Sequence, residues 1–191
     1  MRSGLLGLVV FSVAMVGFGS LTAGAAVHSV YVGTYTKGES EGIYRLEFDD
    51  ETGALSHKGL AGAIENPSFL AIHPSAPVLY AAARKGDAQV VAAFRIESDS
   101  GLLTPLNEQP AGGNGPCHVA VTPDGKHAAV ANYGDGTVSV YPLEKEGGLG
   151  AASAFFQHTG SSADPKRQTA PHAHSVNFDE TGRYLVVADL G

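Results

Sequence analysis

The hydrophobic pattern of the chain is one of short apolar runs separated by turn-forming residues. The runs are four to eight residues long and rich in Val, Ile, Phe and Tyr, as at 78–82, 128–131 and 184–188. Pro-Asp-Gly, Glu-Thr-Gly and Gly-Asp-Gly separate them, and these tripeptides suit tight turns that need positive φ. After residue 25, no stretch keeps a 3.6-residue period for a dozen residues. The pattern therefore predicts an all-β fold of short antiparallel strands.

Two phrases recur along the chain. The first carries proline at its second position and leads into an apolar run, and it occupies residues 66–76, 115–125 and 170–182. The second ends on a turn followed by leucine, and it occupies residues 43–55, 91–103 and, more loosely, 138–149. Leu55, Leu103 and Leu149 are spaced by 48 and 46 residues. Self-similarity at such a period predicts a repeat architecture.

Each repeat of roughly 50 residues holds about four short strands, which is typical of one blade of a β-propeller. A β-sandwich is the alternative, but it has no reason to repeat a phrase at near-constant spacing. The predicted blades are residues 27–64 with three strands, 65–113 and 115–160 with four strands each, and 171–191 with two. The first unit lacks the innermost strand with which each later unit begins. We therefore predict a β-propeller of four-stranded blades, present as an incomplete ring of about three and a half blades.

A propeller ring closes when every blade face is buried against a neighbour, and fewer than four blades do not achieve this. In propellers a strand from the far end of the chain commonly completes the first blade. We expect a truncated product or a partial sequence whose complete form is about twice as long, with an apolar blade face and strand edges exposed in this chain.

The first 25 residues have the features of a secretory signal peptide. Arg2 gives a positive start, residues 5–18 form an uncharged apolar run, and Ala23 and Ala25 supply the small residues of a cleavage site. A membrane anchor is the alternative, but the run is shorter than the roughly 20 apolar residues that span a bilayer. We therefore expect a signal peptide at 1–25, a propeller domain at 26–191, and a periplasmic or secreted protein.

The net charge is −7, and removal of the first 25 residues leaves about −8. Scattered negative charge argues against nucleic acid or an anionic membrane as a partner, because phosphate binding depends on clustered cations. The single cysteine, Cys117, has no second thiol with which to form an internal disulfide. The chain contains no CxxC, HExxH or Gly-rich phosphate loop. We therefore expect neither a cofactor nor a metal.

Several motifs together resemble one family. They are YVGTYT from residue 31, NPSFL from 66, GPCH from 115, VANYGDGTVSV from 130 and PHAHSV from 171. This set is similar to that of the bacterial lactonase family of seven-bladed β-propellers, which includes 6-phosphogluconolactonases and fungal carboxymuconate cycloisomerases. The resemblance runs from about residue 30 to 191. It implies a ring of seven blades and a site at one mouth of the central channel, lined by the innermost strands and the loops leading into them.

Lactone hydrolysis needs a base to take a proton from water, a donor to stabilise the oxyanion and a cation to hold an anionic group of the substrate. His174 is the predicted base, because histidine titrates near neutral pH and because it resembles the family's active-site histidine. His172 lies at the same strand parity and is a further candidate. A hydrogen-bonded structural histidine is the alternative for both residues.

His118 begins the preceding inner strand and is a candidate donor to the substrate. Counting back from the turn glycines Gly125 and Gly182, however, places Cys117 and not His118 opposite His174. The two histidines therefore need not share a face. Cys117 is expected to be a buried small hydrophobe and not a nucleophile.

Arg167, in the polar loop that precedes His172, is the candidate cation for substrate binding, with a solvated loop charge as the alternative. Tyr133, after the second strand of its blade, is a candidate lining residue. The remaining histidines are expected at turns or on the surface: His28, His57, His73, His127 and His158. The family's acidic partner, a glutamate, is expected beyond Gly191.

The leading interpretation is hydrolysis of a sugar-acid lactone, as in 6-phosphogluconolactonases, by histidine-activated water without a metal. Export departs from the cytosolic pentose phosphate pathway and favours an unphosphorylated or different lactone. One alternative is a non-catalytic cell-envelope propeller that binds a ligand or protein, because propellers serve many functions. Another is lactone-forming cycloisomerase chemistry. The expected partner is a small lactone, and the full-length protein is expected to be a monomer.

Overall fold

A computed structural model describes residues 10–16 and 26–191, with only the backbone described for 10–16. Every regular element in these residues is a strand. The bounds are β1 Val10–Val16, β2 Val27–Thr34, β3 Gly42–Asp49, β4 Leu55–Ala63, β5 Glu65–Ile72, β6 Val78–Lys85, β7 Ala88–Ile96, β8 Leu103–Pro110, β9 Pro116–Val121, β10 His127–Asn132, β11 Thr137–Pro142, β12 Ala154–Gln157, β13 Ala173–Phe178 and β14 Leu185–Asp189.

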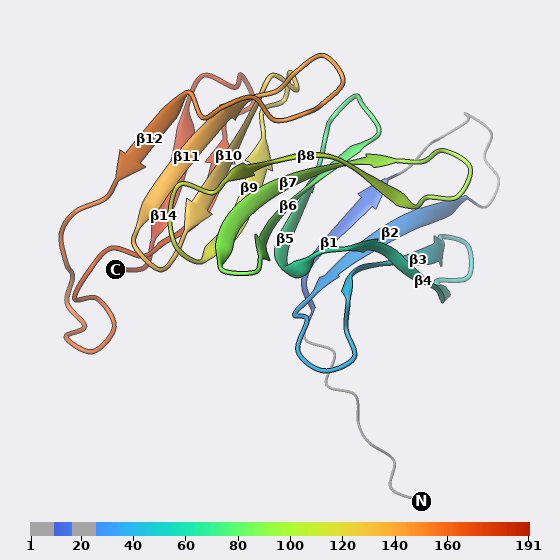
Figure 1. Cartoon of the computed structure of the whole chain (residues 1–191), viewed down its shortest axis with the longest axis horizontal. Helices are drawn as coiled ribbons and strands as arrows, with labels where there is room; N and C mark the ends of the chain where they lie inside the picture. Colours follow the sequence, from blue (N-terminus) through green and yellow to red (C-terminus); the bar gives the residue numbers. More distant parts are fainter. Residues whose placement is uncertain (1–9, 17–25) are drawn as a thin grey trace, which may run out of the picture.

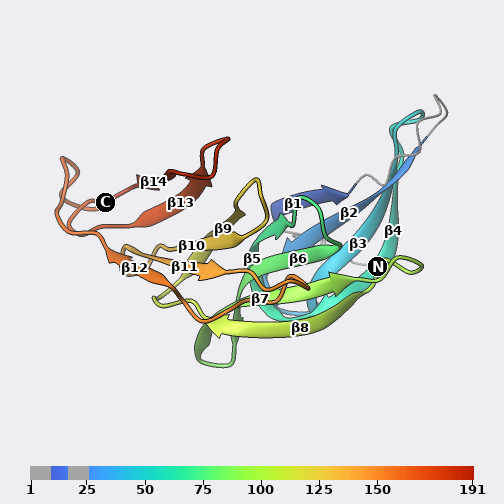
Figure 2. The same cartoon turned by 90° about the horizontal axis from the view of Figure 1, so that it is seen from above.

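The strands form three four-stranded antiparallel sheets, β1–β4, β5–β8 and β9–β12, followed by the pair β13–β14. Each sheet is a meander in which sequence neighbours pair, so each sheet is one blade (Figure 1). β5 contacts both β1 and β9, and β9 contacts β13, which places the first strands of the blades side by side. Seen from above, the blades follow one another from β1–β4 at one end to β13–β14 at the other (Figure 2). The predicted incomplete propeller ring is confirmed.

The first blade differs from the sequence prediction. We expected three strands and no innermost strand there, but β1 pairs antiparallel with β2, with Val13 opposite Val32. The backbone groups along the inner edge of β2 favour a partner strand, and residues 10–16 supply one. This strand falls within the predicted signal peptide, whose other residues lie outside the described part of the chain. Cleavage after Ala25 remains a prediction, and it would remove β1 from β2.

The core lies between blades, in three separate apolar clusters. The sequence of strand β6 is almost continuously apolar because both of its faces are buried. Leu79, Ala81 and Ala83 pack in the cluster shared with the first blade, whereas the alternating Val78, Tyr80 and Ala82 pack in the cluster shared with the third. Because successive strand residues point to opposite faces, a blade between two neighbours must be apolar on both. On the last blade, Val186 of β14 is 62% exposed.

Buried tyrosines join neighbouring blades. The hydroxyl of Tyr31 in β2 donates to the carbonyl of Gly101 in the second blade at 2.7 Å. The hydroxyl of Tyr80 in β6 donates likewise to the carbonyl of Gly147 in the third blade at 2.8 Å. Burial raises the pKa of both phenols, so each stays a donor. Both glycines belong to the recurrent turn that ends in leucine, which gives that repeated phrase a structural role.

We predict that Tyr80→Phe lowers the free energy of unfolding by about 1–2 kcal/mol, because the buried carbonyl of Gly147 loses its donor while the packing is kept. Chemical unfolding of the two proteins measures the difference. Tyr184→Phe is the control, since the Tyr184 side chain is 65% exposed and should change stability by less than about 0.5 kcal/mol. Equal effects of the two changes would contradict the inter-blade role of Tyr80.

Candidate functional site

The larger of two cavities lies at the rim where the inner strands begin and the second strands end. Its volume is about 670 Å³, within the usual range of small-molecule sites. Three lining residues occupy equivalent places at the inner strands of successive blades: Ser68, Cys117 and His174. Three more stand at or just after the ends of the second strands: Tyr35, Arg84 and Tyr133. The second and third blades thus supply both positions, while the first blade supplies Tyr35 and the last supplies His174.

Ser68 and Cys117 link neighbouring blades in the same way. The Ser68 hydroxyl donates to the carbonyl of Pro116 in the next blade at 2.7 Å. The Cys117 thiol contacts the carbonyls of Ala173 at 3.6 Å and His174 at 3.4 Å in the next blade. Burial raises the pKa of the Cys117 thiol to about 11, which keeps it protonated and unreactive. His174 occupies the third such position, and its side chain is exposed toward the cavity.

The loop after β2 is fixed to the start of β5 at the same rim. Asn66 adopts φ of 46°, a left-handed conformation that asparagine tolerates better than most residues. Its side-chain oxygen accepts from the backbone N–H of Thr36 at 3.1 Å, and its own N–H donates to the Thr36 hydroxyl at 3.3 Å. Nearby, a Cβ at Gly33 would lie 2.4 Å from the carbonyl oxygen of Pro67. The two segments therefore approach too closely for a larger residue at Gly33.

Tyr133 joins two of the candidate histidines. Its ring stacks on His172, with centroids 4.5 Å apart, and meets His174 edge-on at 5.6 Å. His172 Nδ1 lies 2.8 Å from the Tyr133 carbonyl oxygen, so in the neutral ring the proton belongs on Nδ1. His172 is thus committed to Tyr133 and does not line the cavity, whereas Tyr133 and His174 both do.

His118 faces away from this cavity, on the opposite strand parity to Cys117. Its ring packs on Phe69, with centroids 4.0 Å apart, and its Nδ1 accepts from the backbone N–H of Val176 at 3.4 Å. Burial, and secondarily the charge of His174, lowers the pKa of His118. The structure therefore places His118 between blades, as a neutral imidazole with its proton on Nε2.

Arg167 lies apart from the other candidates. It is exposed, and its backbone N–H closes a turn on the carbonyl of Asp164 at 3.3 Å. It lines neither of the two cavities described here. The loop leading into the last blade therefore holds Arg167 outside the rim cavity.

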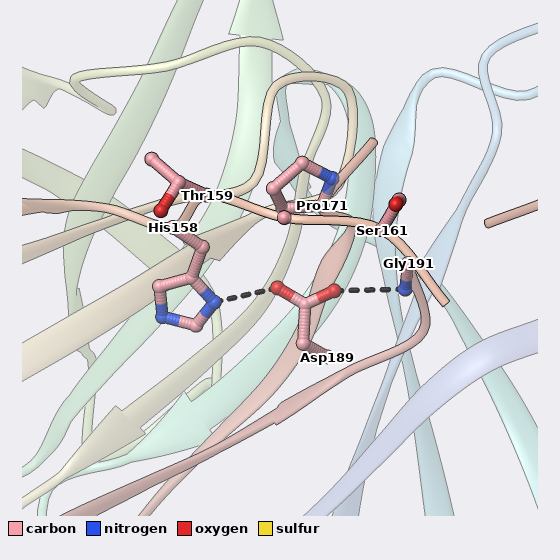
Figure 3. Close-up of a pocket in the computed structure, with 7 residues that line it drawn as sticks. His158, Thr159, Ser161, Pro171, Asp189 and Gly191 are labelled. Carbon is pink, nitrogen blue, oxygen red and sulfur yellow. Dashed lines mark hydrogen bonds and ion pairs between the residues drawn. The ribbon is translucent and has the colours of Figure 1, made fainter. Parts of the chain in front are cut away.

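A second, smaller cavity of about 430 Å³ lies beside the last blade and is lined by His158, Thr159, Ser161, Pro171 and Asp189 among others (Figure 3). His158 Nδ1 lies 2.5 Å from an Asp189 oxygen, and the other oxygen accepts from the backbone of Gly191 and of His172. Burial alone would raise the pKa of Asp189, but these hydrogen bonds together hold it below its usual value. His158 was expected at a turn or surface, and it lies in the loop after β12 with a partly exposed side chain that takes part in this network.

Several cavity residues were not candidates in the sequence analysis, among them Lys37, Ser68 and Arg84. Arg84 stands eight residues after Ala76, as Tyr133 stands eight residues after Gly125. Because Tyr133 was a candidate lining residue, its equivalent in the repeat, Arg84, could have been predicted as one too. In residues 10–16 and 26–191, no group of three or more His, Cys, Asp or Glu is placed to hold a metal ion. The same residues include no helix with the length and hydropathy of a membrane span.

Comparisons with known proteins agree with this architecture. A protein named 6-phosphogluconolactonase from Bacillus subtilis is 41% identical over 161 residues, which cover 84% of this chain and 46% of the relative. A solved structure from Bacteroides fragilis has a TM-score of 0.79 and 34% identity, over 91% of this chain and 48% of that one. The periplasmic gluconolactonase of Pseudomonas aeruginosa has a TM-score of 0.77 and 29% identity, over 87% of this chain and 48% of that one.

The chain thus spans about half the length of the relatives that it matches. The sequence profile described as "Lactonase, 7-bladed beta-propeller" matches residues 29–191, a range that includes all six of the repeat-equivalent rim positions. This chain therefore belongs to the lactonase family of seven-bladed β-propellers.

Proposed function

We propose that the protein hydrolyses a sugar-acid lactone at the rim cavity, with His174 as the general base. The observation that carries the proposal is the position of His174, whose exposed side chain lines a cavity of about 670 Å³ with Tyr133 at its edge. The names of two relatives support the substrate class, since one is a 6-phosphogluconolactonase and the other a gluconolactonase. Export to the periplasm or beyond, by way of the predicted signal peptide, is part of the proposal.

The proposed reaction is a proton-transfer cycle on one imidazole. Neutral His174 takes a proton from water while the water oxygen bonds to the lactone carbonyl carbon. The resulting oxyanion needs donors, and the side-chain amides of Asn66, Gln89 and Asn114 are among the residues that line the cavity. Collapse of the intermediate breaks the ring C–O bond, and the leaving oxygen takes the proton from the imidazolium. The product is the open-chain hydroxy acid.

The contact between Tyr133 and His174 gives the base a fixed orientation. Tyr133 is held by stacking on His172, whose backbone N–H donates to Asp189 at 2.7 Å. His172 and Tyr133 are thus positioning residues in this proposal. His118 stays uncharged at neutral pH, because burial lowers its pKa, and it adds no positive charge beside His174.

We predict that His174→Ala lowers kcat for hydrolysis of 6-phosphoglucono- or glucono-1,5-lactone at least about tenfold, because the general base is lost. Acid release in a pH-stat measures the rate, and the spontaneous rate is subtracted. His127→Ala, at an exposed position of β10 outside the cavity, is the matched control. Unchanged turnover in His174→Ala would remove this residue from the mechanism.

A second variant separates catalysis from structure. His174→Gln keeps a hydrogen-bond donor at residue 174. At the equivalent positions of the preceding blades, Ser68 and Cys117 bond to the next blade. Any stability that His174→Ala loses should be recovered in His174→Gln, but kcat should not. Recovery of kcat in His174→Gln would assign His174 a structural role. No lactone turnover by the wild-type protein, together with retained ligand binding, would favour a non-catalytic propeller. Loss of activity with a chelator would favour metal-dependent hydrolysis.

The lowered pKa of His118 predicts a pH-dependent stability. The unfolded chain takes up a proton at this imidazole below about pH 6.5, while the folded chain resists it, so stability falls as the pH drops through that region. We expect His118→Asn to lose less stability than the wild type between pH 7.5 and 5.5, measured by urea unfolding at each pH. His127→Asn should follow the wild type. An unchanged slope in His118→Asn would show that this ring titrates normally.

A further inference from the structure

One cation at the rim cavity forms no ion pair within the described residues. Arg84 ends the second strand of the second blade and lines the cavity. Its Nε is buried and has no hydrogen-bond partner. Within the described residues, no hydrogen bond or ion pair of this guanidinium is found. A buried guanidinium donor without a partner is costly to fold and therefore points to a ligand.

The carboxylates of Glu65 and Asp135 form their hydrogen bonds with groups other than Arg84. Glu65 lies opposite Arg84 in the β5–β6 ladder, but its side chain accepts from the backbone N–H of Gly86 at 2.6 Å. Asp135 lies near the loop residue Asn114, and its two oxygens accept from the Asn114 N–H at 2.9 Å and from the Thr137 hydroxyl at 2.8 Å. Within the described residues, neither carboxylate forms an ion pair with Arg84.

A second cation lines the same cavity. Lys37 lies three residues after β2, in the loop that Asn66 fixes through Thr36. It forms no ion pair within the part of the chain that the structure describes. No Asp or Glu is among the residues that line this cavity, and Gln89 and Asn114 add amide donors. The ionisable Lys and Arg side chains of the lining are thus not matched by a lining carboxylate, in a protein whose net charge is −7.

We propose that Arg84 and Lys37 form an anion subsite at the rim cavity and that the substrate is a lactone with a negatively charged substituent, phosphate or carboxylate. The inference rests on the proposed function, because His174, the proposed general base, lines the same cavity. A guanidinium presents paired N–H donors that match a carboxylate or phosphate. An ammonium adds charge without fixed geometry. The subsite thus distinguishes charged lactones from the neutral glucono-1,5-lactone.

This assignment differs from the cation that the sequence suggested. Arg167 is exposed, lies on a turn and lines neither described cavity. Arg167 carries the same charge as Arg84 but lies outside the rim cavity, so it is a matched control.

The test compares three lactones: neutral glucono-1,5-lactone, 6-phosphoglucono-1,5-lactone and a glucarolactone with a free carboxylate. In Arg84→Gln and in Lys37→Gln, kcat/KM for a charged lactone should fall at least about tenfold, mainly through KM, because a charge-assisted contact is lost. The value for the neutral lactone should change less than about twofold. Whichever charged lactone loses more identifies phosphate or carboxylate as the group bound. Arg167→Gln should leave all three substrates unchanged.

Equal losses for neutral and charged lactones in both variants would overturn the subsite, and so would no loss at all. Lys37 is exposed, so Lys37→Gln should fold even if Arg84→Gln does not. Arg84→Lys, which keeps the charge but not the fork of donors, should recover only part of the affinity for the charged lactone.

Direct binding separates this inference from the proposed function. Calorimetry with 6-phosphogluconate and with gluconate, neither of which contains a lactone, reports the subsite without turnover. Binding of 6-phosphogluconate that is at least about tenfold weaker in Arg84→Gln would support the subsite even if no lactone were hydrolysed. Lactone hydrolysis with equal 6-phosphogluconate binding by wild type and variant would support the function and overturn the subsite.

Discussion

The structure depends on one constraint: a β-sheet with two apolar faces must have a neighbour on each. Strand β6 meets it by sending alternate residues into the clusters on either side. The hydroxyls of Tyr31 and Tyr80 then reach across to turn carbonyls of the next blade. These bonds fix the offset between adjacent sheets as well as their separation. Where the sequence of blades stops, Val186 is left exposed, as the constraint requires of an unpaired face.

The candidate site follows from the same offset. Because every blade is docked on its neighbour in the same way, equivalent residues come together at one rim. Small donors at Ser68 and Cys117 link the inner strands, and the third member of the series, His174, directs an imidazole into the cavity. At the ends of the second strands, a guanidinium and a phenol stand at repeat-equivalent positions. A scaffold made of near-identical units thereby presents different chemistry at each.

The repeated phrases were sufficient to predict the blades, because turn residues and apolar runs mark each strand locally. They also predicted that Cys117, and not His118, lies opposite His174. The pairing of residues 10–16 with β2 could not be predicted, since an apolar run of that kind also suits a signal peptide. Arg84 was missed for a different reason. A cation that ends an apolar strand has the sequence of an ordinary surface residue. Only the structure shows that its Nε is buried without a hydrogen-bond partner.

The central claim is that blade docking gathers equivalent positions into one ligand site at the rim. A crystal structure of the protein soaked with 6-phosphogluconate tests it most directly. The account predicts the sugar acid in the rim cavity, with its phosphate against Arg84 and Lys37 and its carboxylate toward His174. Density for the ligand beside His158 and Asp189 instead, or an unchanged rim cavity at saturating ligand, would contradict it.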